Sequence, residues 1–219
     1  MDSTVLQEAI ATYKPQDPEY SGPFTSMDAA LRCIVIATNI TKLCFDPPEH
    51  GRITAVFPES RTARWRDLMN DLLSWYSRRP NDMHALIENE GHTNTFRAII
   101  FTNAGAAWAN MMYHTCMLIL ITHKPGSVLL RSEYDKTKAD QRHMSSLWHV
   151  QRVCGIGTSS NPQCWDPCMI AAFYVAAQRM TQINQQKELI ACLERVRATG
   201  WHIEGLTTRL REEWCLPNA

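Results

Sequence analysis

One histidine stands in the middle of the most apolar stretch of this sequence. His114 follows Tyr113 within Met111–Ile121. Burying an ionisable imidazole without a partner costs free energy, so such a side chain needs a hydrogen-bond partner or a ligand. Two interpretations stay open for His114. The more common role is a structural histidine that hydrogen-bonds a neighbouring loop, and the other is a polar group in a binding cavity.

A second pair of polar residues has helical spacing. His149 and Arg152 are three positions apart, so they share one face of a helix. They could place a polar edge on a cavity, although a solvated face is the more usual result. With Tyr113 and His114 they are the candidate catalytic residues if the chain is an enzyme.

Large apolar side chains could line a pocket around these polar groups, because ligand pockets are mostly apolar with a few well-placed polar groups. The alternative is that these side chains only fill the core. The candidate ligand-binding residues, with Met111 beside them, are Trp108, Met112, Tyr113, His114, Trp148, Trp165, Phe173 and Trp201.

The sequence offers no recognised cofactor or metal motif. Among the eight cysteines only Cys164 and Cys168 are close together, and no second Cys or His pair follows at zinc-site spacing. Asn70–Ser74 (NDLLS) begins like the magnesium-binding triad of terpene cyclases, but Arg78 stands where that triad needs a glutamate. Walker loops, serine-hydrolase elbows and His-Glu-x-x-His helices are absent from the sequence. We therefore expect no metal and no cofactor.

The charge and hydropathy of the chain further narrow the classes of binding partner that are expected. The 219 residues contain 22 Lys plus Arg and 22 Asp plus Glu, without the basic excess of proteins that neutralise phosphates. Direct nucleic-acid binding is therefore not expected. The start of the chain lacks the apolar segment of a signal peptide, and Met111–Ile121 is shorter than the ~20 residues of a membrane span. These features predict an intracellular protein, cytoplasmic or nuclear, without membrane contact.

Helical periodicity dominates the sequence and predicts an all-α fold, a single helical array of roughly seven to nine helices. Residues 1–24 are expected to form an N-terminal arm, and residues 25–219 the domain. Gly155 and Gly157 are expected to stop one helix, and Asp166 with Pro167 to start the next as N-cap and first residue. The expected helical segments are Met27–Cys44, Ser60–Arg79, 93–122, Asp140–Val153, a helix after Asp166, Gln186–Thr199 and a last helix with Ile203, Leu206, Leu210 and Trp214.

An ordered series of short motifs runs through most of the chain, from about residue 60 to 215. The series contains Trp65 and Trp75 in RWRDLMNDLLSWY, Tyr113-His114 in MMYHTCMLILIT, Cys154-Gly155-Ile156, Trp165-x-Pro167 with Ile170-Ala-Ala, Gly200-Trp201, and Leu210 with Trp214. This order resembles the C-terminal part of the fungal-specific transcription-factor regulatory domain. The six-cysteine zinc cluster, which reads DNA in that family, is missing from this sequence.

The resemblance implies a helical fold with a cavity between helices that holds a small hydrophobic molecule. We therefore expect a stand-alone regulatory-domain-like protein that binds a terpenoid- or polyketide-like molecule or a partner protein, or forms a homodimer. Its role would be regulatory, without direct DNA contact. The alternative is a cofactor-free natural-product cyclase of the Diels–Alder type in the same pocket, because orientation and a few hydrogen-bond donors suffice for that chemistry.

Overall fold

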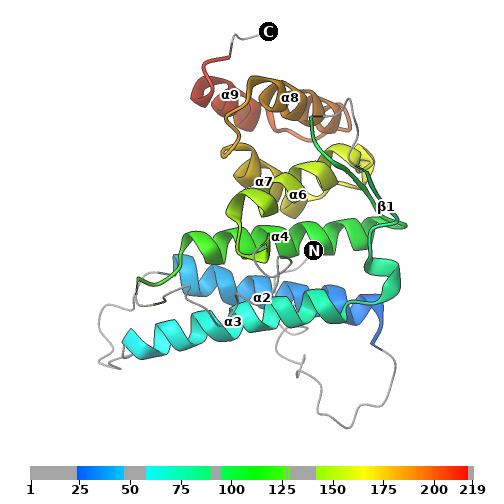
Figure 1. Cartoon of the computed structure of the whole chain (residues 1–219). Coiled ribbons are helices and arrows are strands. Elements are labelled where there is room, and N and C mark those ends of the chain that lie inside the picture. Colours follow the sequence, from blue (N-terminus) through cyan, green and yellow to red (C-terminus); the bar gives the residue numbers. More distant parts are fainter. Residues whose placement is uncertain (1–23, 47–57, 90–94, 127, 129–141, 217–219) are drawn as a thin grey trace.

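The computed structural model describes residues 24–46, 58–89, 95–126, 128 and 142–216. These residues form seven α-helices, two short 3₁₀ helices and one two-stranded sheet, which confirms the all-α class. Figure 1 shows α2, α3 and α4 side by side in the lower half, α6 and α7 above α4, and α8 with α9 at the far end. The expected arm, residues 1–24, lies almost entirely outside the described residues.

The first two described helices close one side of α4. Helix α2 (Ser26–Phe45) begins with a capping box, in which Thr25 and Asp28 exchange side-chain and backbone hydrogen bonds. Helix α3 (Pro58–Arg78) buries a stripe made of Trp65, Leu68, Leu72 and Trp75. The indole of Trp75 donates to the Ala29 carbonyl oxygen at 2.7 Å, which fastens α3 to α2.

Helix α4 (Ala104–Thr122) is the central element, capped by the side chain of Asn103. It buries nearly every residue from Ala106 to Leu120, so apolar side chains face all around it. By length and composition alone this helix could cross a membrane, but 72% of its most apolar window is buried by the rest of the protein. Its apolar character is therefore accounted for by its place in the core.

A small hairpin precedes α4. After the 3₁₀ turn Asn81–Met83, strand β1 (Ile87–Asn89) pairs antiparallel with β2 (Ala98–Ile100), with Ile87 opposite Ile100. The sequence predicted a helical segment from residue 93, which is wrong for β2. Within β2 only Ile99 is buried, against α6, so a strand of three residues satisfies the packing with a single inward side chain.

Helix α6 (Ser146–Ser159) corrects a second expectation, because Gly155 and Gly157 lie inside it and do not end it. A Cβ at Gly155 would lie 2.4 Å from the Arg97 carbonyl oxygen, and one at Gly157 would lie 2.4 Å from the Phe173 ring. Both glycines are thus sites of close approach, and the connection to the next helix begins only at Ser160, with a 3₁₀ turn at Pro162–Cys164.

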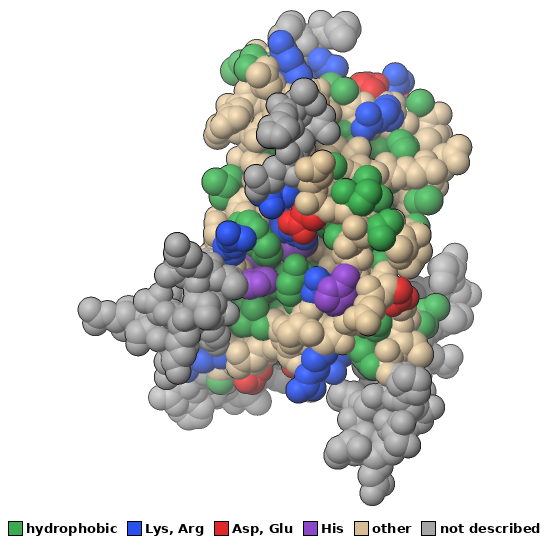
Figure 2. Space-filling model, turned by 45° about the vertical axis from the view of Figure 1, so that its right-hand side comes forward, with side chains coloured by type: hydrophobic (Ala, Val, Ile, Leu, Met, Phe, Trp, Pro, Cys, Tyr) green, Lys and Arg blue, Asp and Glu red, His purple; other side chains and the backbone are tan. Residues whose placement is uncertain are grey.

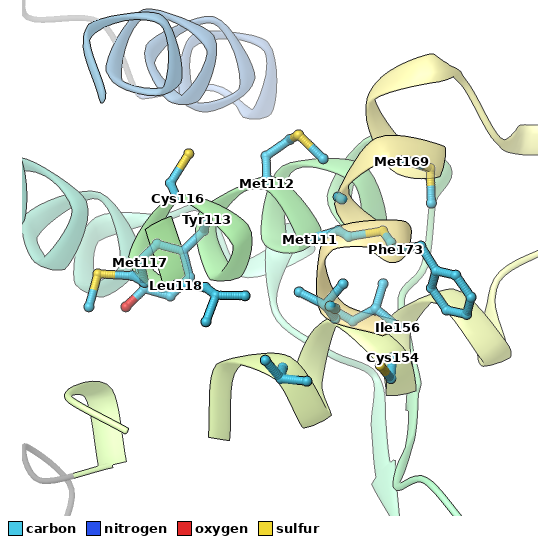
Figure 3. Packing of buried hydrophobic residues seen from close by; sticks show 14 of the residues in the cluster. Met111, Met112, Tyr113, Cys116, Met117, Leu118, Cys154, Ile156, Met169 and Phe173 are labelled. Atoms are coloured by element: carbon cyan, nitrogen blue, oxygen red, sulfur yellow. The ribbon is translucent and has the colours of Figure 1, made fainter. Parts of the chain in front are cut away.

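The C-terminal helices follow the sequence prediction closely. Asp166 caps α7 (Pro167–Ala177) by accepting from the Met169 amide. Helix α8 (Ile183–Arg197) ends shortly before Gly200, whose φ of 104° favours glycine, and α9 (Glu204–Glu213) follows. Figure 3 shows side chains of α4, α6 and α7, including Met111, Ile156 and Phe173, meeting in one core.

Candidate ligand-binding site

Two buried histidines form the centre of the candidate site. His114 on α4 and His149 on α6 have no exposed surface, and their Nδ1 atoms lie 2.9 Å apart. Around them lie Tyr76 from α3, Tyr113 from α4, Trp148 from α6, and His143, three residues before that helix. We call these six residues the histidine cluster.

The hydrogen bonds of the cluster fix where each imidazole carries its proton. Nε2 of His149 lies 2.9 Å from the backbone oxygen of His143. A carbonyl oxygen only accepts, so a neutral His149 donates from Nε2 and accepts at Nδ1. His114 must then donate from its own Nδ1. Its Nε2 is left with a free lone pair.

Both imidazoles are held neutral by their surroundings. Burial lowers the pKa of His114 well below its ordinary value of 6.5, and the positive charges near it, including Arg152 and Arg79, lower it further. Burial also lowers the pKa of His149 to about 4, although the bond to the His143 backbone opposes this shift. The arrangement of donors and acceptors therefore applies at neutral pH.

Nε2 of His114 has no hydrogen-bond partner among the described residues, although it is completely buried. Buried polar atoms in folded proteins are almost always paired, because an unpaired one costs free energy on desolvation. This acceptor is therefore an atom at which a ligand, or a bound water, would gain a hydrogen bond. Nε of Arg79 and Arg152 and Nε1 of Trp165 and Trp214 are the other buried side-chain atoms without a partner among the described residues.

Aromatic rings contact the His114 side chain. Tyr76 stacks on Tyr113 with 4.4 Å between ring centroids and meets the His114 ring edge-on at 5.9 Å. The Trp148 ring, which comes from α6, meets the His114 ring edge-on, with 5.2 Å between the ring centroids. The hydroxyl of Tyr113 lies 3.2 Å from Nδ1 of His143. Burial raises the pKa of Tyr113, so this hydroxyl keeps its proton.

Two arginines complete the site. The guanidinium of Arg152 lies 5.2 Å from the Trp148 ring centroid and pairs with Glu88 of β1. The guanidinium of Arg79 lies 3.6 Å above the Tyr76 ring and donates to the Tyr76 carbonyl oxygen. The expectation that His149 and Arg152 form a solvated face is wrong. Both side chains are buried where α6 packs on α4 and beside the hairpin.

The site has a buried floor and a half-buried rim. Tyr113, His114 and His149 are buried, whereas Tyr76, Arg79, His143 and Trp148 retain partial exposure. Figure 2 shows histidine side chains at the middle of one face of the molecule, with basic and acidic side chains beside them.

The structure brings together the four candidate catalytic residues and Trp148, but not the other candidate ligand-binding residues. Trp108 donates to the Asp166 carboxylate at 2.9 Å, and Met111 and Met112 are core side chains of α4. Trp165 and Phe173 pack edge-to-face in the core, and Trp201 lines a separate surface cavity of about 510 Å³ with Trp165.

Sequence reasoning missed Tyr76, Arg79, Glu88 and His143. Tyr76 and Arg79 lie three residues apart near the end of α3, the same spacing that singled out His149 and Arg152, so this signal was present in the sequence. Nothing in the sequence pointed to Glu88 or His143. Their roles depend on a hairpin and a turn whose positions are set by tertiary contacts.

The described residues contain no group of three or more His, Cys, Asp or Glu side chains arranged to hold a metal ion. Cys164 and Cys168 are exposed and unpaired in the turn before α7 and in its first turn. No family model, no curated protein and no solved structure matches this chain.

Proposed function

We propose that this chain is a helical module of the regulatory type, which binds a small hydrophobic molecule at the histidine cluster and does not contact DNA directly. The observation that carries the proposal is the buried Nε2 of His114, which has no hydrogen-bond partner in the described part of the chain. The sequence resemblance to fungal regulatory domains supports it, as does the balanced charge of the chain. An intracellular setting, cytoplasmic or nuclear, and a protein partner or second copy that reads the bound state belong to the same proposal.

The geometry suggests how the ligand is recognised. The lone pair on His114 accepts a hydrogen bond from a hydroxyl of the ligand, and the rings of Tyr76 and Trp148 contact its apolar body. These side chains come from α3, α4 and α6. Binding would therefore favour one arrangement of three helices, which is the physical basis of regulation by a ligand.

The test compares 2-naphthol, which can donate a hydrogen bond, with 2-methoxynaphthalene, which cannot. Isothermal titration of the full chain should show 2-naphthol binding about tenfold more tightly, the value of one hydrogen bond. In His114→Asn the amide nitrogen can still donate to His149, but the shorter side chain places no acceptor at the position of Nε2, so the preference should disappear. Equal affinities in the unchanged chain, or no binding of either probe, would contradict the proposal.

The second candidate function is a cofactor-free cyclase, which the gathering of Tyr113, His114, His149 and Arg152 in one cluster favours. An intramolecular Diels–Alder reaction converts three carbon–carbon π bonds into two σ bonds and one new π bond and releases nothing, so the product has the mass of the substrate. Incubation with a linear triene, in which a 1,3-diene is tethered to an alkene, followed by chiral chromatography, distinguishes the two functions. A new isomer in enantiomeric excess indicates a cyclase, and recovery of unchanged triene indicates a binding protein.

A further inference from the structure

The charged groups beside the histidine cluster do not balance. Arg79 and Arg152 bring two positive charges, and Glu88 brings one negative charge, which pairs with Arg152 and lies 3.6 Å from Arg97. No described carboxylate pairs with Arg79. Burial lowers the pKa of Arg79, and the positive charge of Arg152 lowers it further.

Both inner arginines also keep a free donor. Nε of Arg79 and Nε of Arg152 are buried and have no hydrogen-bond partner among the described residues. Arg152 is only 9% exposed, so this donor belongs to the interior of the site. These donors belong to cations that pack on the Tyr76 and Trp148 rings, and the same two rings contact His114 with its unpaired acceptor. A hydrogen-bonding anion would satisfy the two donors.

We infer that the molecule bound at the cluster is a hydroxylated aromatic or polyunsaturated acid. Arg79 and Arg152 receive its carboxylate, and His114 accepts from its hydroxyl. This inference rests on the proposed function and narrows it from hydrophobic molecules in general to acids. The rings of Tyr76 and Trp148, each with a guanidinium over it, are where the unsaturated body contacts the protein.

The experiment uses 6-hydroxy-2-naphthoate and its matched amide, 6-hydroxy-2-naphthamide, which have the same shape but differ in charge. Titration of the full chain should show the acid binding at least about tenfold more tightly than the amide. Arg79→Gln and Arg152→Gln should each bring this ratio towards one, and Arg79→Lys should retain most of it. Arg78→Gln, an exposed neighbour on α3, is the matched control and should keep the full preference.

The outcomes separate this inference from the proposed function. If 2-naphthol and the amide bind but the acid binds no more tightly than the amide, the inference of an acidic ligand is overturned and the proposed binding function stands. If none of these probes binds, both fail. If an arginine variant does not fold, as judged by circular dichroism, the acid-to-amide ratio of the unchanged chain still decides.

Discussion

At the scale of single residues, the pair of buried histidines links the site to the stability of the fold. His149 is fixed by two hydrogen bonds, one to the His143 backbone and one to His114. Protonating His149 at Nδ1 would place a donor where His114 needs an acceptor. Protonating either imidazole would also place a charge in the buried interior of the protein. The pair is therefore compatible with the folded state only while both rings are neutral.

This requirement predicts a loss of stability in mild acid. The pKa of His149 is about 4 in the folded protein against 6.5 for the free side chain, so the unfolded chain takes up the proton first as the pH falls. The stabilisation is complete above pH 6.5 and is lost between pH 6.5 and 4. Denaturant titrations should show a free energy of unfolding lower by about 2 kcal/mol at pH 5 than at pH 7 from His149 alone.

Two variants separate this effect from general acid sensitivity. His149→Gln can still donate to the His143 backbone but cannot titrate, so its stability should fall less between pH 7 and 5. His202→Gln removes an exposed histidine before α9 and should behave like the unchanged chain. A pH dependence in His149→Gln equal to that of the unchanged chain would show that His149 is not the source.

At the scale of elements, the contact between α6 and the hairpin depends on a missing side chain. Gly155→Ala would place a Cβ 2.4 Å from the Arg97 backbone oxygen, which cannot move without shifting β2. We expect a loss of about 1–3 kcal/mol in the free energy of unfolding, as for other overpacked sites. Gly205→Ala is the matched control, because it meets nothing within 4 Å in α9 and should stabilise by about 0.5–1 kcal/mol. Equal stabilisation by both substitutions would refute the close approach.

The same glycines show how far local signals predict this fold. Caps act over three or four residues, so Asp166 with Pro167 located the start of α7 from the sequence alone. Propensity treated Gly155 and Gly157 as helix breakers. Their place inside α6 is decided by the Arg97 backbone and the Phe173 ring, which no local pattern can anticipate.

For the candidate site, the residue types in the sequence pointed to several of the side chains that come together. The sequence did not reveal the burial or the partners of those side chains. His114 stood out because an imidazole interrupts an apolar run, and the structure buries it. His149 and Arg152 were expected on a solvated face, since their burial depends on helix α4 and on Glu88, more than 60 positions away in the chain. The prediction that His114 hydrogen-bonds a neighbouring loop was also wrong, because its partner is His149 on helix α6.

At the scale of the whole molecule, helix α4 connects everything else. It contacts α2 and α3 on one side and α6 and α7 on the other, whereas α9 is attached mainly through α8. The histidine cluster lies where the two sides meet, with His114 on α4, His149 on α6 and Tyr76 on α3. A ligand held there would tie the two sides together through the central helix.

This arrangement predicts a gradient of protection in hydrogen–deuterium exchange. Amides between Asn110 and Leu118 should exchange slowest, because their helix is buried on all sides and opens only when the whole fold opens. Amides of α9 should exchange fastest among the described helices, since only Thr207 and Leu210 are buried in it. Adding 2-naphthol should slow exchange near Tyr76 in α3 and near His149 in α6, while α9 stays unchanged. Equal slowing in α9 would mean global stabilisation by a ligand bound elsewhere, and protection confined to α3 and α6 would locate the ligand at the cluster.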